Sequence, residues 1–297
     1  MLVEMAVVAI RTSKLTKDYG AARGLFELDL QVSPQEVFGY LGPNGSGKTT
    51  TIRLLMGMIR PTTGSAHVFG LDCVRDSVEV KRKVGYLPGD VPQFGSLRGG
   101  VDRRHVRAIA ERLDLDLNRR FREYSSGNKQ KLAILLAFMH RPELLVLDEP
   151  TSGLDPLNQQ EFYAMLREAR DDGATVFLSS HILSEVEHVC DRVGILRSGR
   201  LVKVAQLDEL RRIRVHRVEV EFAPDAEVPE ARLRSAPGVE SLKVEGSRVT
   251  CTIRGSFDGL LDAISDSEVT DLVSTEPSLE EFFLSFFGEP RPKALPA

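Results

Sequence analysis

Short apolar segments alternate with longer amphipathic segments along residues 6–200 of the chain. The candidate central strands are VFGYLG (37–42), VGYLP (84–88), LLVLD (144–148) and TVFLSS (175–180). Their continuous apolar character is typical of strands in a sheet that is covered on both faces. The alternation of such strands with helical segments predicts an α/β domain.

The first of these strands runs into a glycine-rich turn and then into a helical pattern. Residues 49–58 place Ile52, Leu55 and Met58 on one face, and Pro61 follows as a stop signal. The sequence therefore predicts a strand, a glycine-rich loop and a helix in immediate succession.

Two charged regions break the α/β pattern. Residues 92–122 are helical in character and predict a shortened helical insertion over about residues 92–140. Residues 201–216 are expected to form a charged connector. Its basic side chains fit either a nucleic-acid or lipid-headgroup contact or a solvated linker face, and the linker is the favoured interpretation. These side chains are Arg211, Arg212, Arg214 and Arg217.

The region after the connector has the pattern of a different domain. Strand patterns at 217–222, 240–253 and 269–275 enclose helical patterns at 229–236 and 257–265, and the middle segment contains two strands. The order β-α-β-β-α-β predicts a small α+β domain of the split βαβ type.

A last helix is predicted over residues 278–288, where four phenylalanines at helical spacing are more typical of packing than of a ligand site. Residues 291–297 are expected to form a disordered tail. The predicted domains are therefore residues 1–210 and 211–290, and the second is interpreted as a docking or dimer-stabilising domain.

Composition narrows the class of protein. The 297 residues carry 39 Lys+Arg and 43 Asp+Glu, for a net charge of −4. This mildly acidic balance argues against nonspecific nucleic-acid binding. The longest apolar run, Leu132–Met139, is far shorter than the ~18 residues that a membrane-spanning helix needs. The three cysteines lack metal-ligand spacing and are expected to be buried thiols in a reducing cytoplasm.

The glycine-rich turn carries the strongest chemical signal in the sequence. Its residues fit the pattern G-x-x-x-x-G-K-[ST], and they are Gly42, Pro43, Asn44, Gly45, Ser46, Gly47, Lys48 and Thr49, followed by Thr50. Glycines let successive backbone N–H groups converge on phosphate oxygens at a helix N-terminus. Lys48 is expected to reach the β- and γ-phosphates, and the Thr49 hydroxyl is a natural Mg²⁺ ligand. The alternative, a turn that matches by chance, is weakened by the strand and helix on either side.

An acidic pair at the end of a buried strand supplies the second signal. The LLVLD strand delivers Asp148 and Glu149 at its carboxyl end, where ligands of open α/β sheets collect. Asp148 is expected to hold Mg²⁺, and Glu149 to polarise the attacking water as the catalytic base. Such strand ends also serve as helix caps, but the phosphate loop and the acidic pair support each other.

Further motifs resemble those of ATP-binding-cassette (ABC) ATPases, which are P-loop NTPases. The segment from Tyr124 to Lys131 is similar to the family's signature motif, Ser152–Asp155 to its D-loop, and Ser180-His181 to its histidine switch. Tyr19 lies where the family places an aromatic residue. The resemblance covers about residues 8–205. Export-type cassettes of the drug- and peptide-resistance kind are similar through residues 278–288 as well.

The resemblance implies a role for each of these residues. Tyr19 would stack on adenine, and His181 would sense the γ-phosphate, although a lone histidine is more often structural. Ser125 is also a plausible helix N-cap. The resemblance implies that Ser125, Ser126 and Gly127 contact the γ-phosphate bound by the other cassette of a homodimer. Asp155 would lie at the dimer seam.

Three features depart from the family pattern. Gly89 stands where the family has a glutamine or glutamate, and glycine has no side-chain oxygen for Mg²⁺ or for the attacking water. The neighbouring Asp90 is the alternative source of such an oxygen. The stretch from Gly89 to Ser125 is also short, and Ser126 replaces the signature's first glycine. ATP binding is expected to survive these changes, with slower or weakly coupled hydrolysis.

The resemblance implies an ATP- and Mg²⁺-dependent ATPase that powers export of a drug, peptide or lipid through a separate transmembrane permease. It would then lie in the cytoplasm, on the inner face of the membrane, without a nucleic-acid partner. One alternative is a nucleotide-binding regulatory module with little turnover. Another is a soluble ABC protein acting on DNA or ribosomes, which the single cassette without coiled-coil insertions or basic extensions disfavours.

Overall fold

A computed structural model describes residues 8–21, 23–89, 102–207 and 215–275. The described chain forms two compact units, of which the first ends at Leu207 and the second includes residues 215–275. The predicted segments 278–288 and 291–297 and the arginines 211, 212 and 214 lie outside the described residues.

The first unit is built on a six-stranded sheet with the order β10-β9-β3-β8-β7-β6. Its strands are β3 (Val37–Leu41), β6 (Val84–Leu87), β7 (Leu144–Asp148), β8 (Thr175–Ser180), β9 (Arg192–Arg197) and β10 (Arg200–Gln206). All neighbours pair in parallel except β10, which runs antiparallel to β9. The four predicted central strands are confirmed, and β3, β7 and β8 are buried along their whole length.

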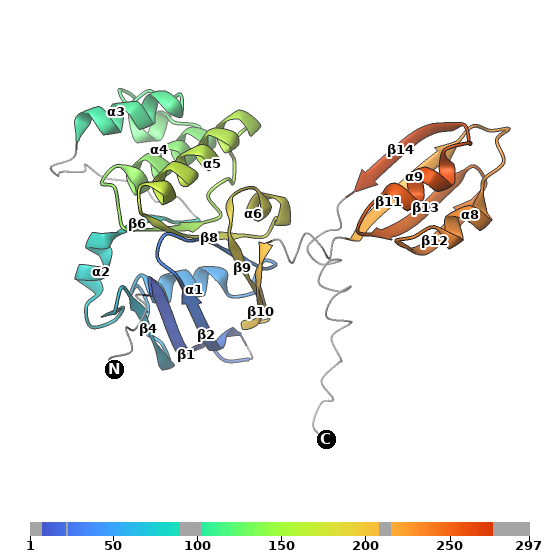
Figure 1. Cartoon of the computed structure of the whole chain (residues 1–297). Helices are drawn as coiled ribbons and strands as arrows, with labels where there is room; N and C mark the ends of the chain where they lie inside the picture. The colour runs from blue at the N-terminus through green and yellow to red at the C-terminus, as the bar shows by residue number, and fades with distance from the viewer. Residues whose placement is uncertain (1–7, 22, 90–101, 208–214, 276–297) are drawn as a thin grey trace, which may run out of the picture. The chain divides into compact units, whose positions relative to one another are not determined.

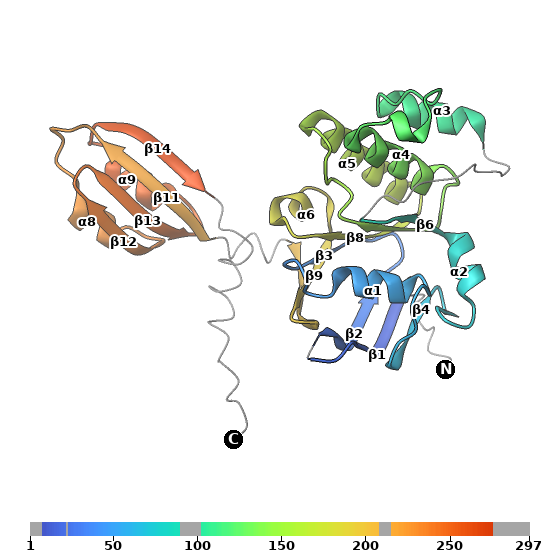
Figure 2. The ribbon, with the colours of Figure 1, turned by 180° about the vertical axis from the view of Figure 1, so that it is seen from behind.

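A second, antiparallel sheet lies on one side of helix α1 (Lys48–Leu55), and the six-stranded sheet lies on the other side (Figures 1 and 2). Its strands, in the order β2-β1-β4-β5, are β1 (Ile10–Asp18), β2 (Gly24–Val32), β4 (Thr63–Val68) and β5 (Leu71–Asp72). The helix that follows the phosphate loop is therefore enclosed between two sheets.

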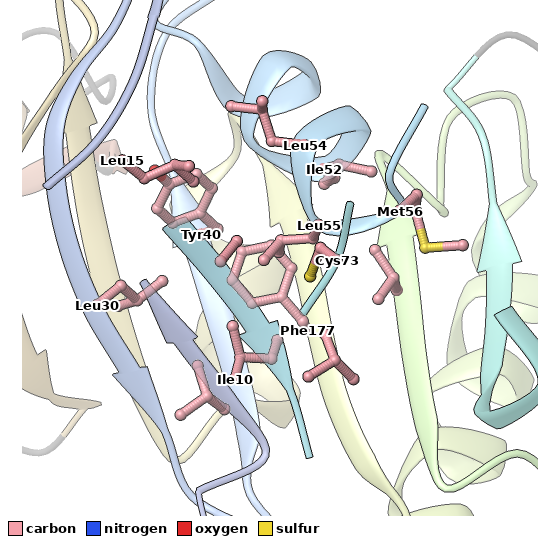
Figure 3. Packing of buried hydrophobic residues seen from close by; sticks show 14 of the residues in the cluster. Ile10, Leu15, Leu30, Tyr40, Ile52, Leu54, Leu55, Met56, Cys73 and Phe177 are labelled. Carbon is pink, nitrogen blue, oxygen red and sulfur yellow. The ribbon is translucent and has the colours of Figure 1, made fainter. Parts of the chain in front are cut away.

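The main hydrophobic core surrounds α1 (Figure 3). Ile52 and Leu55 of the helix are fully buried against Tyr40 of β3 and Phe177 of β8. The Tyr40 and Phe177 rings lie 5.1 Å apart, and the Tyr40 hydroxyl is 3.2 Å from Thr51 Oγ1. These contacts fix the helix, and with it the phosphate loop, against the strands that end at the site.

Helices cover the opposite face of the six-stranded sheet (Figure 2). They are α4 (Ser126–Phe138), α5 (Pro156–Asp171) and α6 (Leu183–Val189), and α3 (Arg103–Arg112) packs against α4 on the side away from the sheet. A 3₁₀ turn covers Phe121–Glu123, and α2 (Ser77–Lys83) leads into β6. The described part of the predicted helical insertion is helical over much of its length, since α3, the 3₁₀ turn and α4 follow one another between residues 103 and 138. Residues 92–101 lie outside the described residues.

The second unit has the predicted β-α-β-β-α-β order. Its elements are β11 (Val215–Phe222), α8 (Glu230–Ser235), β12 (Val239–Glu245), β13 (Arg248–Arg254), α9 (Asp258–Ile264) and β14 (Val269–Thr275). The sheet order β12-β13-β11-β14, with antiparallel neighbours, is that of a split βαβ fold. Val218, Val220, Ile253 and Leu260 lie in its own core.

The predicted helix over residues 49–58 is too long. Helix α1 ends at Leu55, and Met58 is 47% exposed rather than on the buried face. The reason is Gly57, which adopts a left-handed φ of +59° and whose Cβ, if present, would lie 2.2 Å from the carbonyl oxygen of Cys73. Only glycine fits this helix end, which lies before the predicted stop at Pro61.

Of the predicted connector over residues 201–216, the structure describes residues 201–207 and 215–216, and the prediction is wrong for nearly all of these. Residues 200–206 form β10, and β11 begins at Val215. The turn between β9 and β10 places Ser198 and Gly199 at φ +48° and +73°. Positive φ at both central residues is the mark of a hairpin turn that matches the twist of its strands. The charged residues of β10 therefore belong to a sheet edge.

The described helices include none that is long and apolar enough to span a membrane. The three cysteines are free and buried, as predicted. Burial raises the pKa of Cys73 to about 12 and that of Cys251 to about 11. Because the thiolate is the reactive form, these thiols are expected to be inert.

Candidate nucleotide site

The phosphate loop connects β3 to the N-terminus of α1. Gly45 and Gly47 have left-handed φ values of +78° and +111°, which glycine adopts at little cost. Gly47 is the N-cap of α1, and no side chain caps the first turn. The first N–H groups of the helix are thus available to an anion, where the helix dipole also favours negative charge.

Close packing beneath the loop also demands glycine at its first position. A Cβ on Gly42 would lie 2.4 Å from the carbonyl oxygen of Leu196 and 2.6 Å from the hydroxyl of Ser46. The carbonyl oxygen of Ser46 in turn accepts a hydrogen bond from the Gly199 N–H at 2.8 Å. The β9–β10 turn thereby supports the phosphate loop from below.

Lys48 lies back over the loop that precedes it. Its ammonium donates hydrogen bonds to the carbonyl oxygens of Gly42 at 2.7 Å and Pro43 at 3.3 Å, and the side chain is 5% exposed. The same nitrogen lies 3.4 Å from Glu149 Oε1. A buried ammonium next to the N–H groups of the phosphate loop is suited to bind the negative charge of a phosphate chain.

The strand order β3-β8-β7 brings three strand ends together. The phosphate loop follows β3, the acidic pair lies at the end of β7, and His181 follows β8. Glu149 joins them, because its Oε1 faces Lys48 and its Oε2 lies 3.3 Å from His181 Nδ1. The three residues predicted to be catalytic therefore share one contact network, although they come from distant parts of the chain.

Ser179 organises the acidic pair from the neighbouring strand. This fully buried serine donates a hydrogen bond to Asp148 Oδ1 at 2.5 Å and accepts one from the Glu149 N–H at 3.1 Å. Glu149 has a left-handed φ of +48°, which is uncommon for a residue with a side chain. The sequence analysis missed Ser179, because nothing in the sequence distinguishes it from other polar residues at strand ends.

The donors near the phosphate loop fit a magnesium ion. Asp148 is 2% exposed, and Ser179 binds only its Oδ1 atom, while Thr49 is exposed in the first turn of α1. Mg²⁺ commonly takes one or two protein oxygens and completes its shell with phosphate and water, so this sparse set is sufficient. A bound Mg²⁺ would neutralise charge on the phosphate chain.

A cleft of about 540 Å³ opens above the loop, within the usual size range of ligand pockets. The predicted residues that line it are Tyr19, Asn44, Gly45, Gly47, Lys48, Thr49, Thr50 and Glu149. Tyr19 is 54% exposed, and the Lys17 ammonium lies over its ring at 5.4 Å from the centroid. Arg23 and Ser198 also line the cleft. The sequence analysis missed both, because neither belongs to a motif.

The signature segment lies elsewhere in the fold. Ser125 is the N-cap of α4 and accepts a hydrogen bond from the Asn128 N–H at 3.3 Å. A Cβ on Gly127 would lie 3.0 Å from the carbonyl oxygen of Gly153, so the signature and D-loop segments are neighbours. Of the residues that the structure describes, those of the signature segment do not line the cleft above the phosphate loop.

Asp155 caps the helix that follows the D-loop segment. Its carboxylate accepts hydrogen bonds from the Asn158 N–H at 3.0 Å and the Asn158 side chain at 2.6 Å. These contacts lower the pKa of Asp155. The acid is therefore charged near neutral pH and fully occupied as a helix cap.

A phosphate loop between a buried strand and a helix, with an acidic pair on a neighbouring strand, defines a P-loop nucleotide-binding ATPase. Residues 25–152 match the family model described as ABC transporter. The chain is also 37% identical over 221 residues to the bacitracin transport ATP-binding protein BcrA of Bacillus licheniformis, covering 68% of this chain and 71% of that protein. The chain belongs to the ATP-binding-cassette family and is an ATPase of that family.

The likeness to one relative extends over both units. The daunorubicin/doxorubicin resistance ATP-binding protein DrrA of Streptomyces peucetius is 32% identical over 312 residues, which is 95% of this chain and 93% of that protein. Among solved structures, an ATP-binding subunit of an ABC transporter is 29% identical with a TM-score of 0.59, covering 69% of this chain and 92% of that one.

Proposed function

We propose that this chain is the ATP-hydrolysing subunit of an exporter, acting with a separate membrane subunit that carries a drug, peptide or lipid. The site geometry that supports it best is the position of Glu149, whose two carboxylate oxygens face Lys48 and His181 above the phosphate loop. Export is supported by relatives whose names refer to transport of, or resistance to, such compounds. The chain would then act in the cytoplasm, held at the inner face of the membrane by its partner.

Several polar residues in and beside the cleft have a role in the proposed mechanism. The N–H groups of the phosphate loop and the Lys48 ammonium bind and orient the β- and γ-phosphates. Thr49 and Asp148 would hold Mg²⁺. Glu149 accepts the proton of the attacking water, and His181 orients that water and Glu149. Tyr19 stacks on the adenine ring at the mouth of the cleft.

Completion of the site requires a second copy of the chain in this proposal. The N-terminus of α4, with Ser125, Ser126 and Gly127, is a further place where free N–H groups meet a helix dipole. Because it lies apart from the cleft of its own chain, it would contact the γ-phosphate held by a partner copy. Asp155 would lie at the same seam. ATP would then hold the closed dimer, and hydrolysis would release it.

Steady-state phosphate release tests the proposal. The full-length chain is assayed alone and with the membrane protein that co-purifies with it. We expect turnover that rises when the membrane subunit and its transported compound are present. Turnover that never exceeds the background of a Lys48→Ala variant would instead support the regulatory alternative.

The regulatory alternative rests on Gly89. A Cβ on this residue would lie 3.3 Å from Asp148 Oδ2, so position 89 directly faces the metal-binding carboxylate but offers it no side-chain oxygen. A glutamine here would supply an amide oxygen close to the ion and the attacking water. The absence of that oxygen would slow hydrolysis without weakening ATP binding.

Gly89→Gln is accordingly expected to raise kcat about tenfold, less than the ~10²- to 10⁴-fold of a general acid or base, because the amide would only orient the ion and the water. Gly89→Ala, which adds the Cβ but no oxygen, is the matched control and should stay near the parental rate. Phosphate release at saturating ATP measures both. An unchanged rate in Gly89→Gln would mean that Asp90 or water already supplies the missing oxygen.

A further inference from the structure

Two buried hydroxyl groups meet at the carboxylate of Glu185, on α6. The Thr151 hydroxyl donates a hydrogen bond to Glu185 Oε1 at 2.5 Å, and the Ser180 hydroxyl donates one to Glu185 Oε2 at 2.5 Å. Thr151 is 4% exposed and Ser180 is 1% exposed. Each carboxylate oxygen is therefore used by a different loop of the site.

These two loops are the ones that carry Glu149 and His181. Thr151 follows Glu149 by two residues, in a turn closed by the hydrogen bond from the Ser152 N–H to the Glu149 carbonyl oxygen. Ser180 directly precedes His181, and its hydroxyl also accepts the Ile182 N–H at 2.9 Å. The Glu185 carboxylate thus links the segment that follows Glu149 to the residue that precedes His181, next to the point where the Glu149 and His181 side chains meet.

The backbone conformation of Glu149 explains why this link matters. Its left-handed φ of +48° persists only where the surroundings hold it. Ser179 holds the N–H of Glu149 from one side, and Glu185 holds the turn that follows through Thr151. Loss of either contact frees the chain to relax and to move the Glu149 carboxylate away from His181.

We propose that Glu185 is a positioning residue for ATP hydrolysis, which sets the Glu149 loop against the His181 loop through the Thr151 and Ser180 hydroxyls. This inference rests on the catalytic roles proposed for Glu149 and His181. Glu185 acts through the two hydroxyls rather than on the reacting atoms, so its loss affects the chemical step more than ATP binding.

A carboxylate suits this position because it is a pure acceptor with two oxygens. Glutamine has nearly the same shape but only one acceptor oxygen, and its NH₂ group can only donate. In Glu185→Gln one of the two hydroxyls must therefore give up its hydrogen bond to a carboxylate and accept a bond from the NH₂ group instead. The substitution removes the charge from both bonds and weakens the link between the two loops, while it leaves the volume of the side chain nearly unchanged.

The experiment measures kcat and KM for ATP in the full-length Glu185→Gln variant. Glu79→Gln is the matched control, because Glu79 is also the third residue of a seven-residue helix and its carboxylate binds only the exposed Arg82 side chain in the described structure. We expect kcat to fall about 10- to 100-fold in Glu185→Gln, as for a small misplacement of catalytic groups. The KM for ATP should change less than about twofold, and Glu79→Gln should match the parent.

A double-mutant cycle with Ser180→Ala tests whether the loss of kcat arises from the contact between Glu185 and Ser180 rather than from a general loss of structure. If the two residues act through one contact, the double variant should lose little more kcat than the more damaged single variant. Ser180→Ala removes one hydroxyl and carries the test even if Glu185→Gln folds poorly. Additive losses in kcat would overturn the inference, as would equal losses in kcat and ATP binding.

The same measurements separate this inference from the proposed function. An inactive Glu149→Gln variant beside a fully active Glu185→Gln variant would overturn the positioning role alone. Parental turnover in Glu149→Gln would overturn the proposed catalytic base, and the positioning role with it.

Discussion

Glu149→Gln is expected to reduce kcat for ATP hydrolysis by about 10²- to 10⁴-fold, the usual contribution of a general base. The amide keeps the shape of the side chain between Lys48 and His181 but cannot accept the proton of the attacking water. ATP binding should remain, because the phosphate loop and Lys48 are intact. The variant should therefore accumulate as an ATP-bound dimer, which size-exclusion chromatography with light scattering would detect alongside phosphate release.

Glu143→Gln provides the control for this prediction. Glu143 directly precedes β7, whereas Glu149 directly follows it, and Glu143 forms an exposed ion pair with Lys83. The same chemical change at the other end of the same strand should leave turnover unchanged, because exposed ion pairs contribute little to stability. Parental turnover in Glu149→Gln would show that another group acts as the base. An inactive but monomeric variant with ATP would contradict the proposed dimer.

Lys48→Ala should have the next largest effect and should act on binding itself. The substitution removes the buried ammonium proposed to bind the phosphate chain, and with it the hydrogen bonds to the carbonyl oxygens of Gly42 and Pro43, of which Pro43 keeps the Ser46 N–H as a donor. Loss of a charged hydrogen bond of this kind costs ~1.5–3 kcal/mol, equivalent to an approximately 10- to 100-fold weaker Kd for ATP. Isothermal titration calorimetry with ATP measures the change.

Lys83→Ala is a suitable comparison for Lys48→Ala. The Lys83 side chain is 37% exposed and pairs with Glu143 at the surface, so its loss should not change ATP affinity. A Lys48→Ala variant with parental ATP affinity would assign the phosphate chain to another part of the protein. The two substitutions should act on different steps, since Lys48→Ala should weaken ATP binding, whereas Glu149→Gln should bind ATP normally and hydrolyse it far more slowly.

The phosphate loop was predictable because its chemistry is local. Gly45 and Gly47 provide the left-handed backbone, Lys48 follows at a fixed spacing, and the flanking strand and helix have distinct periodicities. The acidic end of β7 was predictable for the same reason, since four apolar residues lead directly to Asp148 and Glu149. Local patterns of this kind depend little on the rest of the fold.

Element ends were harder to predict than element cores. The end of α1 at Gly57 depends on the carbonyl oxygen of Cys73, which comes from another element, and this contact does not show in the local pattern. The edge strand β10 was mistaken for a connector because it was read together with the charged sequence that follows it, although only Arg200 and Lys203 of the strand are charged. Its pairing with β9 at the edge of the sheet is a long-range contact that the local sequence does not show.

The sequence by itself determined the class of chemistry, because a phosphate-binding loop and an acidic strand end are each encoded within a few consecutive residues. The tertiary structure alone decided how these parts meet. The strand order β3-β8-β7 places Glu149 between Lys48 and His181, brings Ser179 under the acidic pair, and sets Glu185 against Thr151 and Ser180. Strand order depends on long-range packing of buried faces, so no local pattern of residues could reveal it.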